Sequence, residues 1–436
     1  MSFSATSYET VVDGSPIILD GDTLTLYHGD TSGPSEVIHQ SHPTSFESSQ
    51  ETTHYFRSLA LILNNSCNLA CKYCYAEQGG YDMPGRRMSP QTAHMGIDRL
   101  IGSVRQNRGE SLTVGFFGGE PILSFDLIED TLDYARKQVP RDIRTTYLLT
   151  TNGTALREDH VKTLEENAVR TTLSIDGNQA AHDSNRVFAN GRGSYAQTVR
   201  AIHLLQGRVP IQARITVSSG NVDIQDSITS ILAIGLRRIT FAVDSGISDA
   251  DFETYLRSLD CFFVKYASDI KNGTYYDVTN ITQPMLSIAM HKKKRAHCNA
   301  GVAYLALSAD GQFYRCHRFT GHKEQSLGRS SSVTGVTIRA SRQERLNNLG
   351  ESAASRSTDC AACPFVYLCG GICFHEALLS TGSEFKTIPR ECRHRRTIYQ
   401  GVVRLLGGMT SQQRRDWLLS LRQLWTNENR EEVISR

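Results

Sequence analysis

Between residues 59 and 244, short apolar runs typical of β-strands alternate with longer segments of helical periodicity. The predicted strands are residues 59–65, 112–118, 145–151, 171–176, 211–217 and 238–244. The predicted helices are residues 90–105, 126–138, 157–167, 195–206 and 224–234. Such βα repeats imply an α/β fold with a parallel sheet covered on both faces, either a barrel or an open doubly wound sheet. In both, chemistry is expected at the C-terminal ends of the strands.

The rest of the chain is divided by its composition. Residues 1–57 contain a predicted hairpin, whose strands 15–19 and 23–27 flank Asp20-Gly21-Asp22, followed by a polar arm. After the βα region of residues 58–250 we expect a helical bridge over 251–290, a cysteine-rich domain over 291–400 and a terminal helix over 401–436.

Charge and hydropathy give no reason to expect a nucleic-acid or membrane partner. The chain has 47 Lys and Arg residues against 45 Asp and Glu, and it contains no apolar run of about 18 residues. Its first residues lack the basic start and apolar stretch of a signal peptide, so a cytoplasmic location is predicted. Thiols stay reduced there, so eleven cysteines indicate metal ligands rather than disulfides.

The first three cysteines, Cys67, Cys71 and Cys74, have the spacing C-x3-C-x2-C. On a helix they would share one face, which allows a buried core cluster, but the Asn and Ser residues before them and Gly79-Gly80 after them favour a loop. Three thiolates can bind three irons of a cubane and leave the fourth iron without a protein ligand. A closed zinc site needs a fourth ligand, and no His lies between His54 and His94.

This spacing, with Tyr73 directly before the last cysteine, resembles the signature of the radical S-adenosylmethionine (SAM) superfamily. The resemblance implies a [4Fe-4S] cluster whose open iron binds SAM, cleavage of SAM to a 5′-deoxyadenosyl radical, and a partial (β/α)6 TIM barrel. Other family motifs are matched in order. Gly118-Gly119-Glu120 resembles the GGE motif, and the match implies that the two glycines let the backbone approach SAM closely and that Glu120 binds the SAM ammonium group. Further matches at SAM-binding positions are Tyr73, Asn152, Ser174, Asp176 and Arg186.

The later cysteines have the pattern C-x12-G-x4-C, then C-x2-C-x5-C-x3-C, then a last cysteine. A zinc ribbon on the close pairs is the alternative, but the full pattern resembles the SPASM extension of peptide-modifying radical SAM enzymes. That resemblance implies two auxiliary [4Fe-4S] clusters, making three in all. One would be held by Cys360, Cys363, Cys369 and Cys392, and the other by Cys298, Cys316 and Cys373. The fourth iron of the second would be open, or ligated by His297 or a distant side chain. The remaining cysteine, Cys261, is expected to be a buried core thiol.

The resemblance predicts an enzyme that takes a hydrogen from a ribosomally made precursor peptide and forms a C–C, ether or thioether cross-link. Peptide epimerisation is an alternative, as is formylglycine formation by a sulfatase maturase, although that branch carries Asp where this chain has His317. We take His317 as the candidate catalytic residue. An iron–sulfur electron carrier or redox sensor is the alternative from another class. The expected partners are the precursor peptide and a flavodoxin- or ferredoxin-type reductant. The N-terminal hairpin would bind a leader peptide by strand addition, or cap the barrel.

Overall fold

The computed structural model describes residues 6–28, 35–36, 56–81, 85–329 and 357–427. The fold is α/β, built on one ten-stranded sheet in these residues, of order β11-β10-β9-β8-β7-β6-β5-β12-β13-β14. Six of its strands carry the predicted βα repeats: β5 (Ser58–Ile62), β6 (Ser111–Phe117), β7 (Arg144–Thr151), β8 (Arg170–Ser174), β9 (Ile211–Val217) and β10 (Arg238–Val243). They are parallel and in sequential order, which confirms the predicted strands. A doubly wound sheet would reverse its order, so the arrangement is that of an open, partial barrel.

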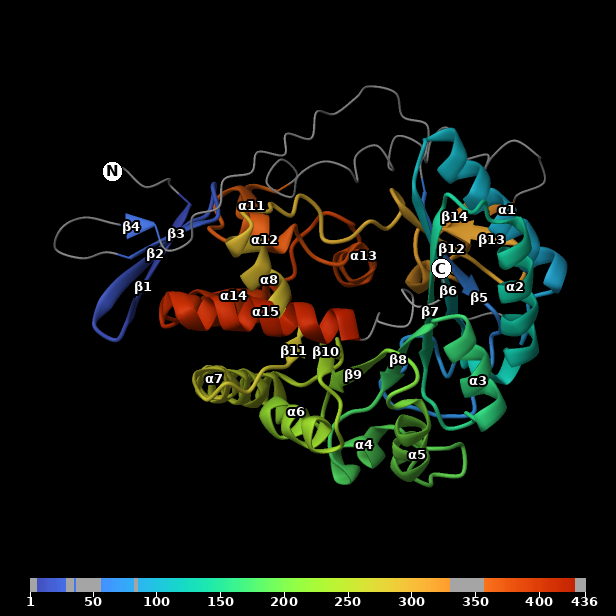
Figure 1. Cartoon of the computed structure of the whole chain (residues 1–436), viewed down its shortest axis with the longest axis horizontal. Helices are drawn as coiled ribbons and strands as arrows, with labels where there is room; N and C mark the ends of the chain where they lie inside the picture. The colour runs from blue at the N-terminus through green and yellow to red at the C-terminus, as the bar shows by residue number, and fades with distance from the viewer. Residues whose placement is uncertain (1–5, 29–34, 37–55, 82–84, 330–356, 428–436) are drawn as a thin grey trace.

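Helices follow these strands and lie along the right and lower sides of the sheet in Figure 1. They are α1 (Pro90–Gln106), α2 (Phe125–Gln138), α3 (Glu158–Glu166), α4 (Gln179–Asn185), α5 (Tyr195–Leu205) and α6 (Ile224–Ala233). Local sequence sets their starts. In α1, for example, the Ser89 side chain accepts a hydrogen bond from the Thr92 amide and Pro90 occupies the first turn. Alternate residues of β6, namely Leu112, Val114 and Phe116, are buried.

The sheet continues into the predicted cysteine-rich region. Strand β12 (Tyr304–Leu307) pairs in parallel with β5, and Leu307 lies opposite Leu61. Strands β13 (Gln312–Tyr314) and β14 (Ser326–Arg329) follow in antiparallel order. At the other edge β11 (Asp277–Val278) pairs with β10. Strands from both sides of the predicted domain boundary at residue 291 therefore belong to one sheet.

The C-terminal part is mainly helical. The long helices are α7 (Asp249–Lys271), α8 (Thr279–Ala289), α14 (Pro389–Gly407) and α15 (Ser411–Asn427), and the short ones are α11 (Thr358–Ala361), α12 (Val366–Cys369) and α13 (Phe374–Thr381). The prediction for Cys261 is wrong: it is exposed, because the buried stripe of α7 runs through Leu259, Phe262 and Phe263 and leaves Cys261 on the outer face. Among the described helices, none is both long enough and apolar enough to cross a membrane.

The N-terminal residues form an antiparallel sheet of β1 (Ser7–Val12), β2 (Ser15–Asp20), β3 (Thr25–His28) and β4 (Ser35–Glu36). The predicted hairpin is β2–β3, and β1 was not predicted. This sheet lies at the left of Figure 1, beside α14 and α12. Tyr8 packs on Phe365 with ring centroids 5.0 Å apart, and a Cβ at Gly407 of α14 would meet Ile17. The sheet thus contacts α14 and the segment after Cys363, which differs from the expected cap on the barrel. The predicted polar arm lies mostly outside the described residues.

Candidate active site

The first three cysteines lie in a loop that follows β5, as predicted. Burial, together with the nearby charges of Glu120, Cys71 and Cys74, raises the pKa of Cys67 to about 12. Burial also raises the pKa of Cys71, which the positive charge of Arg186 partly offsets. Each thiol that loses its proton therefore makes the next one harder to ionise, which shows that the three thiols are close enough for their charges to interact.

The glycines after β6 pack against this cysteine loop. The Gly119 amide donates to the Asn64 carbonyl (3.0 Å), and the Glu120 amide donates to the Ser66 carbonyl (2.8 Å). A Cβ at Gly119 would overlap the carbonyl oxygen of Ser66, and a Cβ at Gly118, whose φ is +150°, would lie 2.8 Å from the Asn64 carbonyl oxygen. Gly118 and Gly119 are thus needed so that the backbone of one loop can lie directly on that of the other.

The Glu120 carboxylate is buried and nearly saturated with hydrogen bonds. Its Oε1 accepts from the Thr151 hydroxyl (2.6 Å) and the Ile122 amide (3.0 Å), and its Oε2 accepts from the Asn152 amide (2.7 Å). Burial raises its pKa, while these three donors act in the opposite direction. A carboxylate has about four acceptor sites, so one site remains, on Oε2.

A buried ion pair connects the end of β8 to the cysteine loop. Asp176 accepts from the Tyr73 hydroxyl, from Arg186 Nε (3.0 Å) and from the Thr216 amide (2.8 Å), and it is fully buried. The Arg186 guanidinium also lies over the Tyr73 ring, 5.3 Å from its centroid. The sequence assigned Tyr73, Asp176 and Arg186 separately to SAM binding. The structure brings them into one network.

Asn152 and Ser174 lie at the C-terminal ends of β7 and β8. Asn152 Nδ2 donates to Asn68 Oδ1 (3.0 Å) and lies 3.8 Å from Cys67 Sγ. Ser174 is half-buried, and in the described part of the chain its hydroxyl makes no hydrogen bond. All the predicted SAM contacts therefore surround the cysteine loop at one end of the sheet.

The seven later cysteines in the described chain fall into two neighbouring groups. In the three-cysteine group (Cys298, Cys316 and Cys373), burial and the charges of Cys373 and Cys298 together raise the pKa of Cys316 to about 12. In the four-cysteine group (Cys360, Cys363, Cys369 and Cys392), burial and the charges of the other three cysteines together raise the pKa of Cys392 to about 11. Lys294 faces Cys298 of one group and Cys369 of the other.

The donor chemistry of these groups fits iron–sulfur clusters. In each group, burial and mutual repulsion make it unfavourable for the thiols to ionise. Bound iron would offset this free-energy cost because it ligates the thiolate form. Within the described residues, no three Cys, His, Asp or Glu side chains are already arranged tightly enough to chelate a single metal ion.

His317 lies between the loop after β5 and the three-cysteine group. Its Nδ1 is 2.7 Å from the Tyr304 hydroxyl, and its ring centroid is 4.4 Å from that of Phe117, the last residue of β6. Burial and the positive charges of Arg318 and Arg214 lower the pKa of His317 to about 3. The imidazole is therefore neutral. The rings of His317, Tyr75 and Tyr304 form an aromatic wall.

Three residues beside His317 were missed by sequence reasoning: Tyr75, Tyr304 and Arg214. Arg318 lies over the Tyr75 ring (4.9 Å) and pairs with Glu376. Arg214, on β9, faces Tyr75, Tyr73 and two other arginines, and in the described residues it has no carboxylate partner. A signal was present, because Gln212, Arg214 and Thr216 alternate with the buried apolar residues of β9. Their polarity marks the inner face of the partial barrel.

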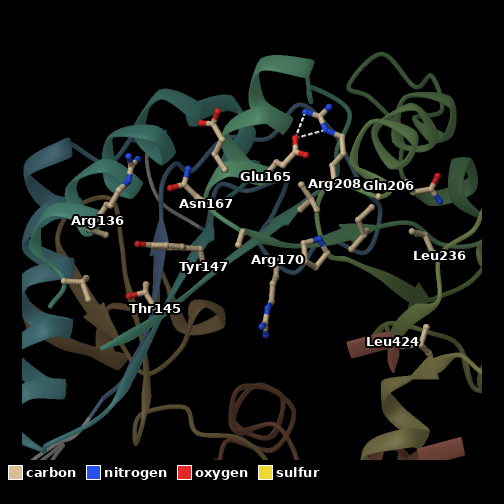
Figure 2. Close-up of a pocket in the computed structure, with 18 of the residues that line it drawn as sticks. Arg136, Thr145, Tyr147, Glu165, Asn167, Arg170, Gln206, Arg208, Leu236 and Leu424 are labelled. Atoms are coloured by element: carbon tan, nitrogen blue, oxygen red, sulfur yellow. Dashed lines mark hydrogen bonds and ion pairs between the residues drawn. The ribbon is translucent and has the colours of Figure 1, made fainter. Parts of the chain in front are cut away.

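A separate cavity of about 880 Å³ lies at the opposite ends of the strands (Figure 2). It is bordered by the starts of β7, β8 and β9, by the ends of α2 and α3, and by Leu424 of α15. Figure 2 shows Arg208 paired with Glu165 at this cavity, and the distance between their charged groups is 2.6 Å. None of the cysteines in the described chain lines it, so it is not part of the site around the cysteine loop.

Comparison with known families agrees with this geometry. Residues 61–246 match the model of the Radical SAM superfamily. These residues form a radical SAM domain. It contains the cysteine loop and every predicted SAM contact, whereas the three-cysteine and four-cysteine groups lie C-terminal to it.

Similarity to individual proteins extends beyond the radical SAM domain. The chain is 25% identical over 341 residues to a cysteine-type anaerobic sulfatase-maturating enzyme of Clostridium novyi, covering 73% of this chain and 88% of that one. It is 26% identical over 340 residues to the antilisterial bacteriocin subtilosin biosynthesis protein AlbA of Bacillus subtilis, covering 75% and 69%. A match of 29% identity to an uncharacterized protein of Methanocaldococcus jannaschii spans 42% of this chain and 62% of that protein's length.

Among solved structures, anSMEcpe with bound AdoMet and Kp18Cys peptide superposes with a TM-score of 0.65 at 19% identity. The superposition covers 81% of this chain and 99% of that one. At this identity the likeness shows the fold alone. It extends over more of the chain than the radical SAM domain does.

Proposed function

We propose that this chain is a radical SAM maturase that takes a hydrogen atom from a ribosomally made precursor peptide and closes an intramolecular C–C, ether or thioether cross-link. The observation that carries the proposal is the wall of Tyr75, Tyr304 and His317. These side chains lie between the cysteine loop and the three-cysteine group. A substrate seated there would contact both. The similarity to proteins that mature a sulfatase and a bacteriocin supports a polypeptide substrate.

The residues of the chain would divide the work by position. Cys67, Cys71 and Cys74 would hold the cluster, and the free acceptor site on Glu120 Oε2 suits the SAM ammonium. When bound, cluster and SAM would supply the 5′-deoxyadenosyl radical. The peptide would lose one hydrogen atom to that radical and a proton as the new bond closes, and the one remaining electron would pass to an auxiliary cluster. Arg214 offers an unpaired guanidinium on the inner face of the sheet, suited to a carboxylate or carbonyl of the peptide. His317 is proposed to contact the substrate, oriented by Tyr304.

The first test is SAM cleavage. Anaerobically reconstituted protein with dithionite should release 5′-deoxyadenosine, and reduced flavodoxin or ferredoxin should replace dithionite as the reductant. A protein that binds iron yet releases no 5′-deoxyadenosine would be an electron carrier or redox sensor, and the proposal would fail.

The second test is the product. A short peptide encoded beside this gene, coexpressed with the protein, should lose two hydrogens per cross-link by mass spectrometry. An unchanged mass with a D-residue would show an epimerase instead. The matched control is the triple variant with Cys67, Cys71 and Cys74 replaced by Ala, which should leave the peptide unmodified.

Formylglycine formation is the second candidate, favoured by the similarity to the Clostridium novyi enzyme across most of both chains. His317 stands where the resemblance expects the Asp of that branch, which argues against it. A peptide from a sulfatase active site decides between them. Appearance of an aldehyde that reacts with a hydrazine would favour the sulfatase-maturase function over the cross-linking function.

A further inference from the structure

Helix α14 presents one face to the four-cysteine group. Cys392, Arg396 and Tyr399 are spaced at i, i+4 and i+7, which places them on the same side of a helix. Tyr399 is buried, and the Tyr8–Phe365 contact and Ile17 of the N-terminal sheet pack around the same helix. This face is therefore fixed by packing.

Three of the four sulfur atoms each have their own side-chain hydrogen-bond donor. The Ser357 hydroxyl donates to Cys360, the Arg396 guanidinium to Cys363 and the Tyr399 hydroxyl to Cys369. Arg395 places a positive charge beside Cys369, in addition to the charge of Arg396 beside Cys363. Arg395 is itself hydrogen-bonded to Tyr399. The four-cysteine group thus lies among donors and cations that the chain supplies from one helix and one neighbouring serine.

The three-cysteine group has a different environment. The hydrogen bonds that the structure shows to Cys298 and Cys316 come from backbone amides, those of Ala300, Arg318 and Phe319. Backbone donors of this kind cannot be changed by a side-chain substitution. The donors around the four-cysteine group can, so their effect is open to measurement.

We propose that Tyr399 and Arg396 are positioning residues that set the reduction potential of the cluster held by the four-cysteine group. A reduced cluster carries one more negative charge than an oxidised one, and hydrogen bonds to its sulfurs stabilise that charge and raise the potential. The inference rests on the proposed function only in requiring that these four cysteines hold a cluster. It does not depend on which peptide is modified.

The test is a redox titration followed by electron paramagnetic resonance on the full chain, reconstituted with iron and sulfide. Replacing Cys67, Cys71 and Cys74 with Ala removes the SAM-cluster signal, and the signal that survives a further Cys316→Ala change belongs to the four-cysteine group. In that background we compare Tyr399→Phe and Arg396→Gln with the unchanged chain. The matched control is Arg393→Gln, on the same helix, where an exposed Arg393 pairs with Glu253.

We expect Tyr399→Phe and Arg396→Gln each to shift the ratio of reduced to oxidised cluster about tenfold toward the oxidised form at fixed potential, which is about 59 mV for one electron. Arg396→Lys should restore part of the shift, and Arg393→Gln should cause none. Unchanged midpoints with full iron content would overturn the inference while leaving the proposed function intact. Loss of about four irons in Tyr399→Phe would also overturn it, because the phenol would then be needed to hold the loop. Failure of the proposed function would show separately, as absent SAM cleavage.

Discussion

Gly119 lies so close to Ser66 that a methyl group at position 119 would overlap the carbonyl oxygen of Ser66. The two backbones belong to the loops that carry Glu120 and Cys67, and two amide-to-carbonyl hydrogen bonds join them. The position of the cysteine loop is therefore set by the loop after β6.

Gly119→Ala should displace the cysteine loop. We expect the variant to lose about four irons and its rate of 5′-deoxyadenosine formation to fall at least about a hundredfold, because misplacement by about 1 Å has effects of that size. The control is Gly102→Ala, since a Cβ at Gly102 in α1 would meet no neighbouring atom. Gly119→Ala protein with normal iron content and rate would show that the loop adapts.

Iron content should follow the grouping of the cysteines. Three clusters require about twelve irons per chain, so replacing Cys67, Cys71 and Cys74 with Ala should leave about eight and abolish SAM cleavage. Cys261→Ala is the matched control because Cys261 is exposed on α7 and far along the chain from each group. It should leave the iron count unchanged. Iron analysis of each purified protein after reconstitution decides the matter.

Asp176→Asn should destabilise the fold. Asp176 is the counter-ion of the buried Arg186, and its removal leaves that cation uncompensated, at a cost of roughly 3 kcal/mol. The free energy of unfolding, measured from urea titrations, should fall by about this amount. Asp159→Asn breaks an ion pair with Arg157 on the surface and should leave the urea midpoint unchanged. Equal midpoints for both variants would contradict the role assigned to the buried pair.

His182 should make stability depend on pH. Its Nδ1 accepts from the Asp176 amide (3.4 Å), so Nε2 donates to Ser194 (2.9 Å), and no site is left for a second proton. Burial and the charge of Arg186 lower its pKa to about 3. The unfolded chain, with a pKa of about 6.5, binds the extra proton between these values, so stability falls as the pH drops below 6.5.

At pH 5 this loss amounts to about 2 kcal/mol. It should appear as a lower urea midpoint at pH 5 than at pH 7, and His182→Gln should remove that part of the difference. If the wild-type protein and His182→Gln lose the same stability between these pH values, the proton is taken up elsewhere.

The sequence predicted those parts of the fold whose signals are local. The strands β5 to β10 each combine an apolar run with a turn signal, and the loop nature of Cys67–Cys74 follows from its polar neighbours. The contact between Gly119 and Ser66 could not be predicted, because it depends on how two loops from different strands meet. The resemblance suggested that these glycines approach a ligand. In the structure they approach the cysteine loop.

Two other failures have different causes. For Cys261 the signal was available: the apolar residues of α7 recur every three or four positions, and Cys261 is off that stripe. For Arg214 the signal was weaker, because the alternation of Gln212, Arg214 and Thr216 with apolar residues shows that they share a face but not that this face points inward. Its inward position depends on the curvature of the whole sheet.

The pairing of β12 with β5 affects how this protein can be dissected. A fragment ending at the predicted boundary near residue 290 would keep the whole radical SAM motif, yet it would expose the backbone N–H and C=O groups of β5 along a bare edge. Exposed apolar edges of this kind recruit strands from other molecules and lead to aggregation. The partner that protects β5 is supplied by the segment that also carries Cys316, so the radical-generating half depends on the cysteine-rich half to remain a single molecule in solution.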